Sequence, residues 1–268
     1  SEEIFLSSYI CHPSMANNEL SGPTVLTFLN KWLLENTNRR YTYRTVFIPE
    51  TIGSIAYLSE NYMALKKNVV AGYNVSCVGD NRAYSYIPSR NGNTLSDKVA
   101  KHVLQWIDPG YVNYQWSDRG SDERQYCAPG IDLPIASILR TKFGKYPEYH
   151  TSLDDLKNVV TPEGLNGGYW AIRRAIELLE MNINYSSNIL CEPQMGRRGL
   201  YPTISTGKEN YEIDKMMNFI SYCDGDHTLL DIAEKLNTPT WEFYEIVKKL
   251  VAEKIIIKKE PKKIRYKY

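Results

Sequence analysis

Metal-type side chains stand near the ends of several apolar segments of the sequence. They are imidazole, carboxylate and amide groups, and they occur in five places: His12; Asn18 with Glu19; Glu50; Asp80; and His150. Zinc in proteins is held by imidazole nitrogens and carboxylate oxygens that separate loops bring together. A zinc hydrolase also needs a carboxylate that takes a proton from water, and acids are among the groups at these places. The pattern therefore predicts a site with zinc as its cofactor.

Each of these residues also has a purely structural explanation. A lone histidine is more often a structural or surface residue than a ligand, and Glu50, which follows a proline, could simply begin a helix. His102 and His227 keep that explanation because no second ligand type lies in their segments. His12 and His150 differ from them because both flank conspicuous polar loops.

The segments that must position these side chains alternate between strand and helix patterns. Buried or alternating apolar runs predict strands at residues 2–10, 40–50, 68–80 and 131–141. Helical spacing predicts helices at residues 21–37, 51–62, 95–107 and 161–183. Ser21 is the expected N-cap of the first helix.

Strands that alternate with helices of this length predict an α/β fold, a doubly wound and mostly parallel sheet with helices on both faces. The predicted domain spans residues 1–185. Ligands of such folds bind beyond the carboxyl ends of the strands, and the metal-type side chains fall there.

A different texture begins at residue 186. Residues 186–208 carry Pro, Gly, Ser and Thr without a long apolar period, which indicates a linker. Residues 209–268 hold three helical segments, and the basic segment 254–268 that ends them is expected to form a β-hairpin. Three helices followed by a hairpin are the outline of a winged helix-turn-helix domain.

The charge of this second domain bears on DNA binding. Residues 254–268 include seven basic residues and one acidic residue, as a wing that contacts DNA phosphates would require. The expected recognition helix instead carries Glu242, Glu245 and Glu253 among its lysines, which suits protein packing better than base reading. DNA is therefore the less favoured partner of this domain.

Composition excludes several other classes of protein. With 32 basic and 31 acidic residues and a net charge of +1, the chain as a whole is not a polyanion binder. Its five cysteines form no CxxC pair, which favours a reducing, cytoplasmic compartment over a disulfide framework. No apolar run approaches the ~20 residues that span a bilayer, so no membrane partner is expected. A homo-oligomer is left open, and the strand pattern at residue 1 indicates a piece of a longer protein.

Five segments together resemble the co-catalytic zinc aminopeptidases, a family that includes bacterial leucyl aminopeptidases, glutamate carboxypeptidase and the single-zinc glutaminyl cyclases. In order, they are His12 with ANNELSG, then PETIGSIAYL, NVSCVGD, GSDERQY and EYHTSLDDL. The resemblance covers residues 1 to about 183, in the order of the family. The chain is more similar still to bacterial polysaccharide-biosynthesis proteins that have an aminopeptidase-like domain and a C-terminal winged helix. Those proteins carry a further domain before the histidine loop.

The resemblance implies a role for each matching residue. His12 resembles the first metal-binding histidine of the family, and His150 the last. Asn18 falls where the family has a metal-bridging aspartate, and an amide oxygen is a weaker ligand because it carries no charge. Glu50 stands where the family has a general-base glutamate followed by a ligand glutamate, but a single acid is present here.

Further positions depart from the family pattern or add to it. The ligand aspartate of the third strand falls on Ser76, and Asp80 either replaces it or merely begins a turn. Asp122 and Glu123 are spare acids that could replace a missing ligand or base. Arg124 could bind a substrate carboxylate, so these last three are the candidate substrate-binding residues.

Two functions follow from the resemblance. The first is a zinc-dependent hydrolase, an aminopeptidase-like metallopeptidase, that cleaves a peptide or an N-acyl amide bond of a small-molecule substrate linked to polysaccharide biosynthesis. The second is a catalytically degenerate module that keeps the fold for binding or regulation. The amide of Asn18 and the single acid Glu50 favour the second function.

Overall fold

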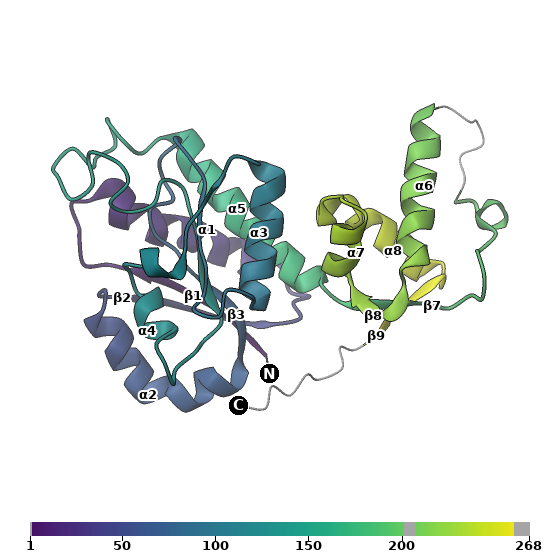
Figure 1. Cartoon of the computed structure of the whole chain (residues 1–268), viewed down its shortest axis with the longest axis horizontal. Helices are drawn as coiled ribbons and strands as arrows, with labels where there is room; N and C mark the ends of the chain where they lie inside the picture. Colours follow the sequence, from purple (N-terminus) through teal and green to yellow (C-terminus); the bar gives the residue numbers. More distant parts are fainter. Residues whose placement is uncertain (1, 201–206, 260–268) are drawn as a thin grey trace. The chain divides into compact units, whose positions relative to one another are not determined.

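The computed structural model describes residues 2–200 and 207–259, which belong to two compact units (Figure 1). The first unit ends at Ile176 and the second begins at Glu177, a boundary that falls inside one helix. Within the described residues, no helix combines the length and the apolar character needed to cross a membrane.

A six-stranded sheet forms the centre of the first unit. Its strand order is β2-β1-β3-β6-β4-β5. The strands β1, β2, β3 and β6 are parallel, whereas β4 is antiparallel to β6 and β5 runs parallel to β4. The bounds are Glu3–Tyr9 (β1), Thr42–Ile48 (β2), Val69–Asn74 (β3), Ser85–Ile87 (β4), Val112–Asn113 (β5) and Ile135–Leu139 (β6).

Helices cover both faces of this sheet. On β1, Phe5 packs with Leu58 of α2 and Tyr126 of α4. Ser8 has the opposite parity on the strand and faces α1, where Gly22 comes so close that a methyl group would collide with the Ser8 hydroxyl. The bounds are Ala16–Leu20 (η1), Ser21–Glu35 (α1), Ile52–Asn68 (α2), Leu95–Ile107 (α3), Trp116–Asp118 (η2), Glu123–Tyr126 (α4) and Pro162–Met181 (α5). Figure 1 shows α1 on one side of the strands and α2 with α4 on the other.

The predicted doubly wound, mostly parallel α/β fold is confirmed by this arrangement. Helix α3 begins and ends where the sequence predicts, and a capping box of Thr94 and Asp97 fixes its start. The strands β4 and β5 are not predicted from the sequence, since three and two residues are too few to display an alternation.

The second unit combines helices with a three-stranded antiparallel sheet of order β8-β7-β9. Its core includes Tyr185, Met195, Phe219, Phe243 and Leu250, all fully buried. The helices and the sheet match the predicted winged-helix outline. The bounds are Asn184–Ser187 (β7), Met195–Arg198 (η3), Gly207–Ser221 (α6), Asp224–Thr228 (β8), Leu229–Lys235 (α7), Thr240–Glu242 (η4), Tyr244–Ala252 (α8) and Ile256–Lys259 (β9).

Parts of the predicted linker lie in this second unit. Strand β7 ends at Ser187, and Met195 is buried in the core of the unit. Residues 201–206 of the predicted linker and residues 260–268 of the predicted hairpin lie outside the described residues. The division into residues 1–185, 186–208 and 209–268 stays a prediction.

Candidate metal centre

Two loops at the carboxyl ends of β1 and β2 bring three metal-type side chains together. Cys11 and His12 follow β1, and Glu50 follows β2, its parallel neighbour in the sheet. One ligand atom from each residue lies within 4.8 Å of those of the other two, and we call these three residues the ligand cluster. Cys11 is exposed and the other two are half-buried, so the cluster is open to solvent. Doubly wound folds bind their ligands at this edge of the sheet.

The loop that carries His12 is held in place by the buried Asp154. The backbone carbonyl of Asp154 accepts the N–H of Ala16 at 2.8 Å, and its carboxylate accepts the N–H groups of Asn17 and Asn18 at 2.7 and 3.0 Å. These N–H groups belong to the first turn of η1 and have no acceptor inside the helix. The carboxylate of Asp154, distant in the sequence, therefore caps the N-terminus of η1. The prediction that Ser21 caps α1 is wrong, because Ser21 is already helical and donates its hydroxyl to the carbonyl of Asn17 at 2.6 Å.

Ring contacts place His150 beside His12. Their ring centroids are 5.3 Å apart with an interplanar angle of 24°. The ring of Tyr149 stacks on that of His150, with 3.9 Å between the ring centroids. His150 has a φ of 59°, in the left-handed region that is uncommon for a residue other than glycine. Two histidines that are distant in the sequence therefore lie side by side.

Glu50 opens a strained turn. The N–H of Ile52 donates to the carbonyl of Glu50 at 2.7 Å, and Thr51 between them has φ 64° and ψ −67°. These angles belong to the rarer form of the γ-turn. The N–H of Thr51 donates to Oδ1 of the buried Asp122 at 2.8 Å, which holds the turn in this conformation.

Two buried acids lie behind the cluster. Oε2 of Glu19 is 3.6 Å from Nδ1 of His12, and burial raises the pKa of Glu19, which the nearby His12 partly opposes. Burial also raises the pKa of Asp122 to about 6, against the hydrogen bonds that it accepts from Thr51 and Ser54. Within the described residues, Oε2 of Glu19 and Oδ2 of Asp122 have no hydrogen-bond partner. A bound cation would satisfy such oxygens, so the residues present fit a metal ion.

Asn18 is turned towards Tyr9. Its Nδ2 donates to the Tyr9 hydroxyl oxygen at 2.8 Å, and that hydroxyl donates to the backbone carbonyl of Asn18 at 2.8 Å. Oδ1 of Asn18 is buried and finds no hydrogen-bond partner in the part of the chain that the structure describes. Asn18 therefore offers a neutral oxygen and no charge.

Asp80 belongs to a different network. Its carboxylate accepts hydrogen bonds from the N–H and hydroxyl of Thr141 at 2.8 and 2.5 Å, from the N–H of Arg82 at 3.0 Å and from Nδ2 of Asn17 at 3.1 Å. The structure does not bring this fully bonded carboxylate into the ligand cluster. Its hydrogen bonds instead join three loops.

The three predicted substrate-binding residues take different positions. Glu123 accepts hydrogen bonds from two N–H groups of its own loop and from Nδ2 of Asn74, so it is turned away from solvent. Arg124 is exposed and donates to Oγ1 of Thr51 at 3.2 Å. Asp122 and Arg124 thus reach the γ-turn that follows β2, whereas Glu123 supports its own loop.

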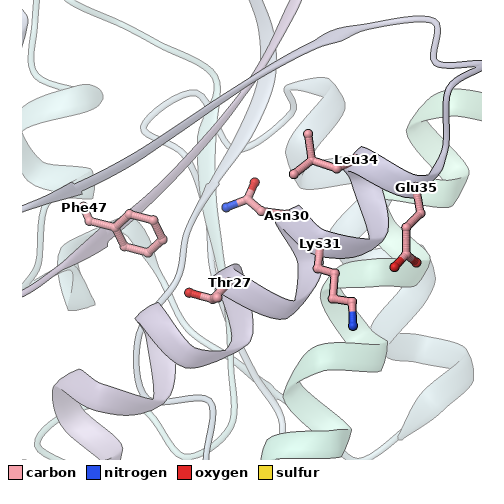
Figure 2. Close-up of a pocket in the computed structure, with 6 residues that line it drawn as sticks. All are labelled: Thr27, Asn30, Lys31, Leu34, Glu35 and Phe47. Carbon is pink, nitrogen blue, oxygen red and sulfur yellow. The ribbon is translucent and has the colours of Figure 1, made fainter.

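A separate groove lies on the first unit between α1 and β2, as Figure 2 shows. Its volume is about 610 Å³, and Phe47 of β2 faces a row of α1 residues across it. The lining residues are Thr27, Asn30, Lys31, Leu34, Glu35 and Phe47. None of them belongs to the ligand cluster, so the groove is not the candidate metal centre.

A family model described as a domain of unknown function (DUF4910) matches residues 1–182. The chain belongs to this family. A second model, described as winged helix-turn-helix, matches residues 183–258 and confirms the winged-helix domain.

Two relatives of this DUF4910 chain are proteins of Clostridium acetobutylicum. One, provisionally named a polysaccharide biosynthesis protein with an aminopeptidase-like domain, is 40% identical over 237 residues, which are 87% of this chain and 54% of the relative. A crystal structure from the same organism, provisionally named a peptidase, matches with a TM-score of 0.86 and 35% identity over 97% of this chain and 58% of that one. The chain therefore spans little more than half the length of these relatives.

More distant structures share the fold. A zinc aminopeptidase from Bacillus subtilis matches with a TM-score of 0.56 and 15% identity, over 66% of this chain and 46% of that one. The first unit of the DUF4910 chain thus has an aminopeptidase-like fold. The resemblance that the five sequence segments indicate is confirmed by this fold and by the name of the Clostridium relative.

Sequence reasoning did not single out two residues of the site. Cys11 stands next to a predicted ligand histidine, and that adjacency was the available signal. It is a weak signal, because neighbouring side chains of an extended chain point to opposite sides, whereas Cys11 lies at a bend and its Sγ is 3.0 Å from Nδ1 of His12. Asp154 gave no signal beyond its place in the segment that holds His150.

Proposed function

We propose that the first unit is a zinc-dependent hydrolase that cleaves a peptide or an N-acyl amide bond. The observation that supports this most strongly is the ligand cluster, where groups from two strand ends converge beside the ring of His150. The aminopeptidase-like fold supports the same reaction class.

His12 and His150 would hold the metal, because imidazole nitrogens are zinc ligands and the two rings lie side by side. Zinc, when bound, polarises the substrate carbonyl and makes water a better nucleophile at neutral pH. Glu19 lies behind His12, where its carboxylate orients the ring and adds negative charge.

Glu50 is the group that moves the proton. Its carboxylate lies close to the ligand atom of His12, within reach of a water molecule between them. A carboxylate oxygen of Glu50 takes the proton from the attacking water and delivers it to the amide nitrogen that leaves. The γ-turn at Thr51, held by Asp122, fixes the backbone from which this side chain extends.

The substrate is an amide of modest size. Arg124 presents an exposed guanidinium beside the γ-turn and would bind a carboxylate of the substrate. The name of the Clostridium relative supports an amide carried on a modified sugar, alongside a peptide. A peptide and an N-acylated sugar both contain the amide bond that the proposed hydrolase would cleave.

Metal analysis combined with an activity screen tests this function. Protein purified without chelators is expected to contain zinc and to hydrolyse members of a panel of aminoacyl anilides and N-acylated amino sugars. His12→Ala and His150→Ala should each lose zinc and activity, whereas His227→Ala, at a half-buried histidine of the second unit, should lose neither. Zinc-free protein that stays inactive after zinc is added would contradict the proposal.

A binding module is the second candidate function. It is favoured by the neutral amide of Asn18, and by the hydrogen bonds that engage Asp80 away from the cluster. The same screen distinguishes the two functions, because a binding module would hold zinc or a substrate analogue without hydrolysing any member of the panel.

The winged-helix unit is proposed to bind protein. On α8, Lys248 pairs with Glu245 at 2.6 Å, and Lys215 of α6 contacts Glu242 at 2.7 Å. Lysines that are neutralised by neighbouring acids are poor phosphate ligands.

A further inference from the structure

The thiol of Cys11 lies against the ring of His12. Its Sγ is 3.0 Å from Nδ1 of His12, and it accepts the backbone N–H of Glu50 at 3.3 Å. These two contacts hold the sulfur between the loops that follow β1 and β2. The position of the sulfur is thus fixed by contacts to both loops.

Negative charge gathers around this sulfur. Ligand atoms of Cys11, His12 and Glu50 lie within 4.8 Å of one another, and Oε2 of Glu19 is 3.6 Å from Nδ1 of His12. Glu19 points independently to a cation site, because its side chain is only 3% exposed and its Oε2, aimed at His12, has no hydrogen-bond partner among the described residues. The carboxylates of Glu50 and Glu19 thus lie near the thiol and the His12 ring, and a divalent cation would stabilise this arrangement.

The chemistry of the donors decides which cation fits. His12 and His150 are neutral when they bind a metal, so they bring no ligand charge. A thiolate is a strong zinc ligand, and Cys11 would supply one negative charge beside the ring of His12. Soft sulfur beside imidazole selects zinc over magnesium or calcium, which prefer oxygen ligands.

We propose that Cys11 is a ligand of the same zinc ion as His12. As the sulfur–zinc bond forms, the thiol releases its proton to solvent, so zinc binding is accompanied by proton release. This inference rests on the proposed zinc site and adds a ligand to it. The two residues thus have different roles: Cys11 binds the metal, and Glu50 accepts the proton.

X-ray absorption at the zinc edge tests the assignment directly. A zinc–sulfur shell at about 2.3 Å, longer than the ~2.0–2.1 Å of nitrogen and oxygen ligands, is expected for the full chain and for Cys191→Ser. Cys191 is the exposed free thiol of the second unit and serves as the matched control. Cys11→Ser should lose the sulfur shell and weaken zinc binding by at least about tenfold.

Thiol alkylation followed by peptide mass spectrometry gives a second readout. Cys11 is exposed, so a maleimide should label it in chelator-treated protein, and added zinc should protect it. Cys191 should be labelled equally with and without zinc. Zinc that binds without a sulfur shell and without protecting Cys11 would overturn this inference while leaving the proposed hydrolase intact. Failure of the full chain to bind zinc at all would overturn both.

Discussion

The carboxylate of Asp154 accepts the backbone N–H of Asn18 at 3.0 Å, although the two residues are 136 positions apart. The same carboxylate accepts the N–H of Asn17 and the hydroxyl of Tyr146. The loop that carries His12 is therefore fastened to the loop that carries His150. The geometry of the candidate metal centre depends on this fastening more than on either loop alone.

Replacement of Asp154 by alanine should damage both stability and metal binding. Three buried donors lose their acceptor, so the free energy of unfolding in urea should fall by about 3 kcal/mol or more. Zinc affinity, measured by competition with a chelating dye, should fall as well because the two histidines are no longer held together. Asp155→Ala is the control and should cost less than about 1 kcal/mol, since the hydrogen bonds of its carboxylate to described residues stay within the turn of residues 155–158. Equal losses in the two variants would contradict the fastening role.

The order of strands and helices could be predicted because each element follows from local pattern. The run Val69–Asn74 is apolar on both faces, as a central parallel strand requires. Helix α3 carries its own capping box at Thr94 and Asp97. The strands β7 and β8 were missed because four or five polar residues show no alternation of their own.

The site was predictable only in outline, because its details depend on contacts between distant segments. The side-chain type of His12 and His150 and their places after strands predicted that they would meet at the carboxyl edge of the sheet, and the structure brings their rings side by side. The capping of η1 by Asp154 could not be predicted, since no local pattern distinguishes that acid from its neighbour Asp155. The approach of Cys11 to His12 depends on a backbone bend that the sequence does not encode in any period.

Asn18→Asp should make the metal-free protein less stable and the zinc-bound protein comparatively more stable. The new carboxylate loses the donor that Asn18 offers to Tyr9 and is 2% exposed, which should cost about 1–3 kcal/mol without metal. A negative charge beside bound zinc should offset that cost. Unfolding of the variant and of the wild type, each with zinc and with chelator, measures both effects. No larger stabilisation by zinc in the variant would argue that Asn18 lies outside the reach of the metal.

Glu50→Gln should separate metal binding from proton transfer. The amide keeps the shape of the side chain but cannot take a proton, so hydrolysis of the best substrate should fall by about 100-fold or more. Zinc content should stay near the wild-type value, because His12, His150 and Cys11 are unchanged. Loss of zinc in this variant would instead make Glu50 a metal ligand.

The winged-helix unit should show no salt-dependent affinity for duplex DNA. Two of its described lysines, Lys215 on α6 and Lys248 on α8, pair with Glu242 and Glu245, which reduces the positive charge available to phosphates. A gel-shift titration of the full chain at ~50 mM salt is the measurement. Glu245→Lys provides the comparison. A gel shift that appears only in this variant would show that the wild-type unit fails to bind DNA because its positive charge is too low. A salt-sensitive shift with the wild type would refute the expectation.

The pKa of Asp122, raised to about 6 from its ordinary 3.8 by burial, should make the metal-free protein less stable as the pH rises. Because the folded state holds the proton more tightly than the unfolded state, the favourable contribution is complete below about pH 4 and is lost as the pH rises through about 6. The cost at pH 8 is on the order of 3 kcal/mol. Asp122→Asn should therefore be more stable than the wild type at pH 8 and similar at pH 4, when both are unfolded by urea with chelator present. Glu60→Gln, an exposed acid of α2, should match the wild type at both pH values, and a variant Asp122→Asn that is no more stable at pH 8 would mean that the carboxylate is charged at little cost.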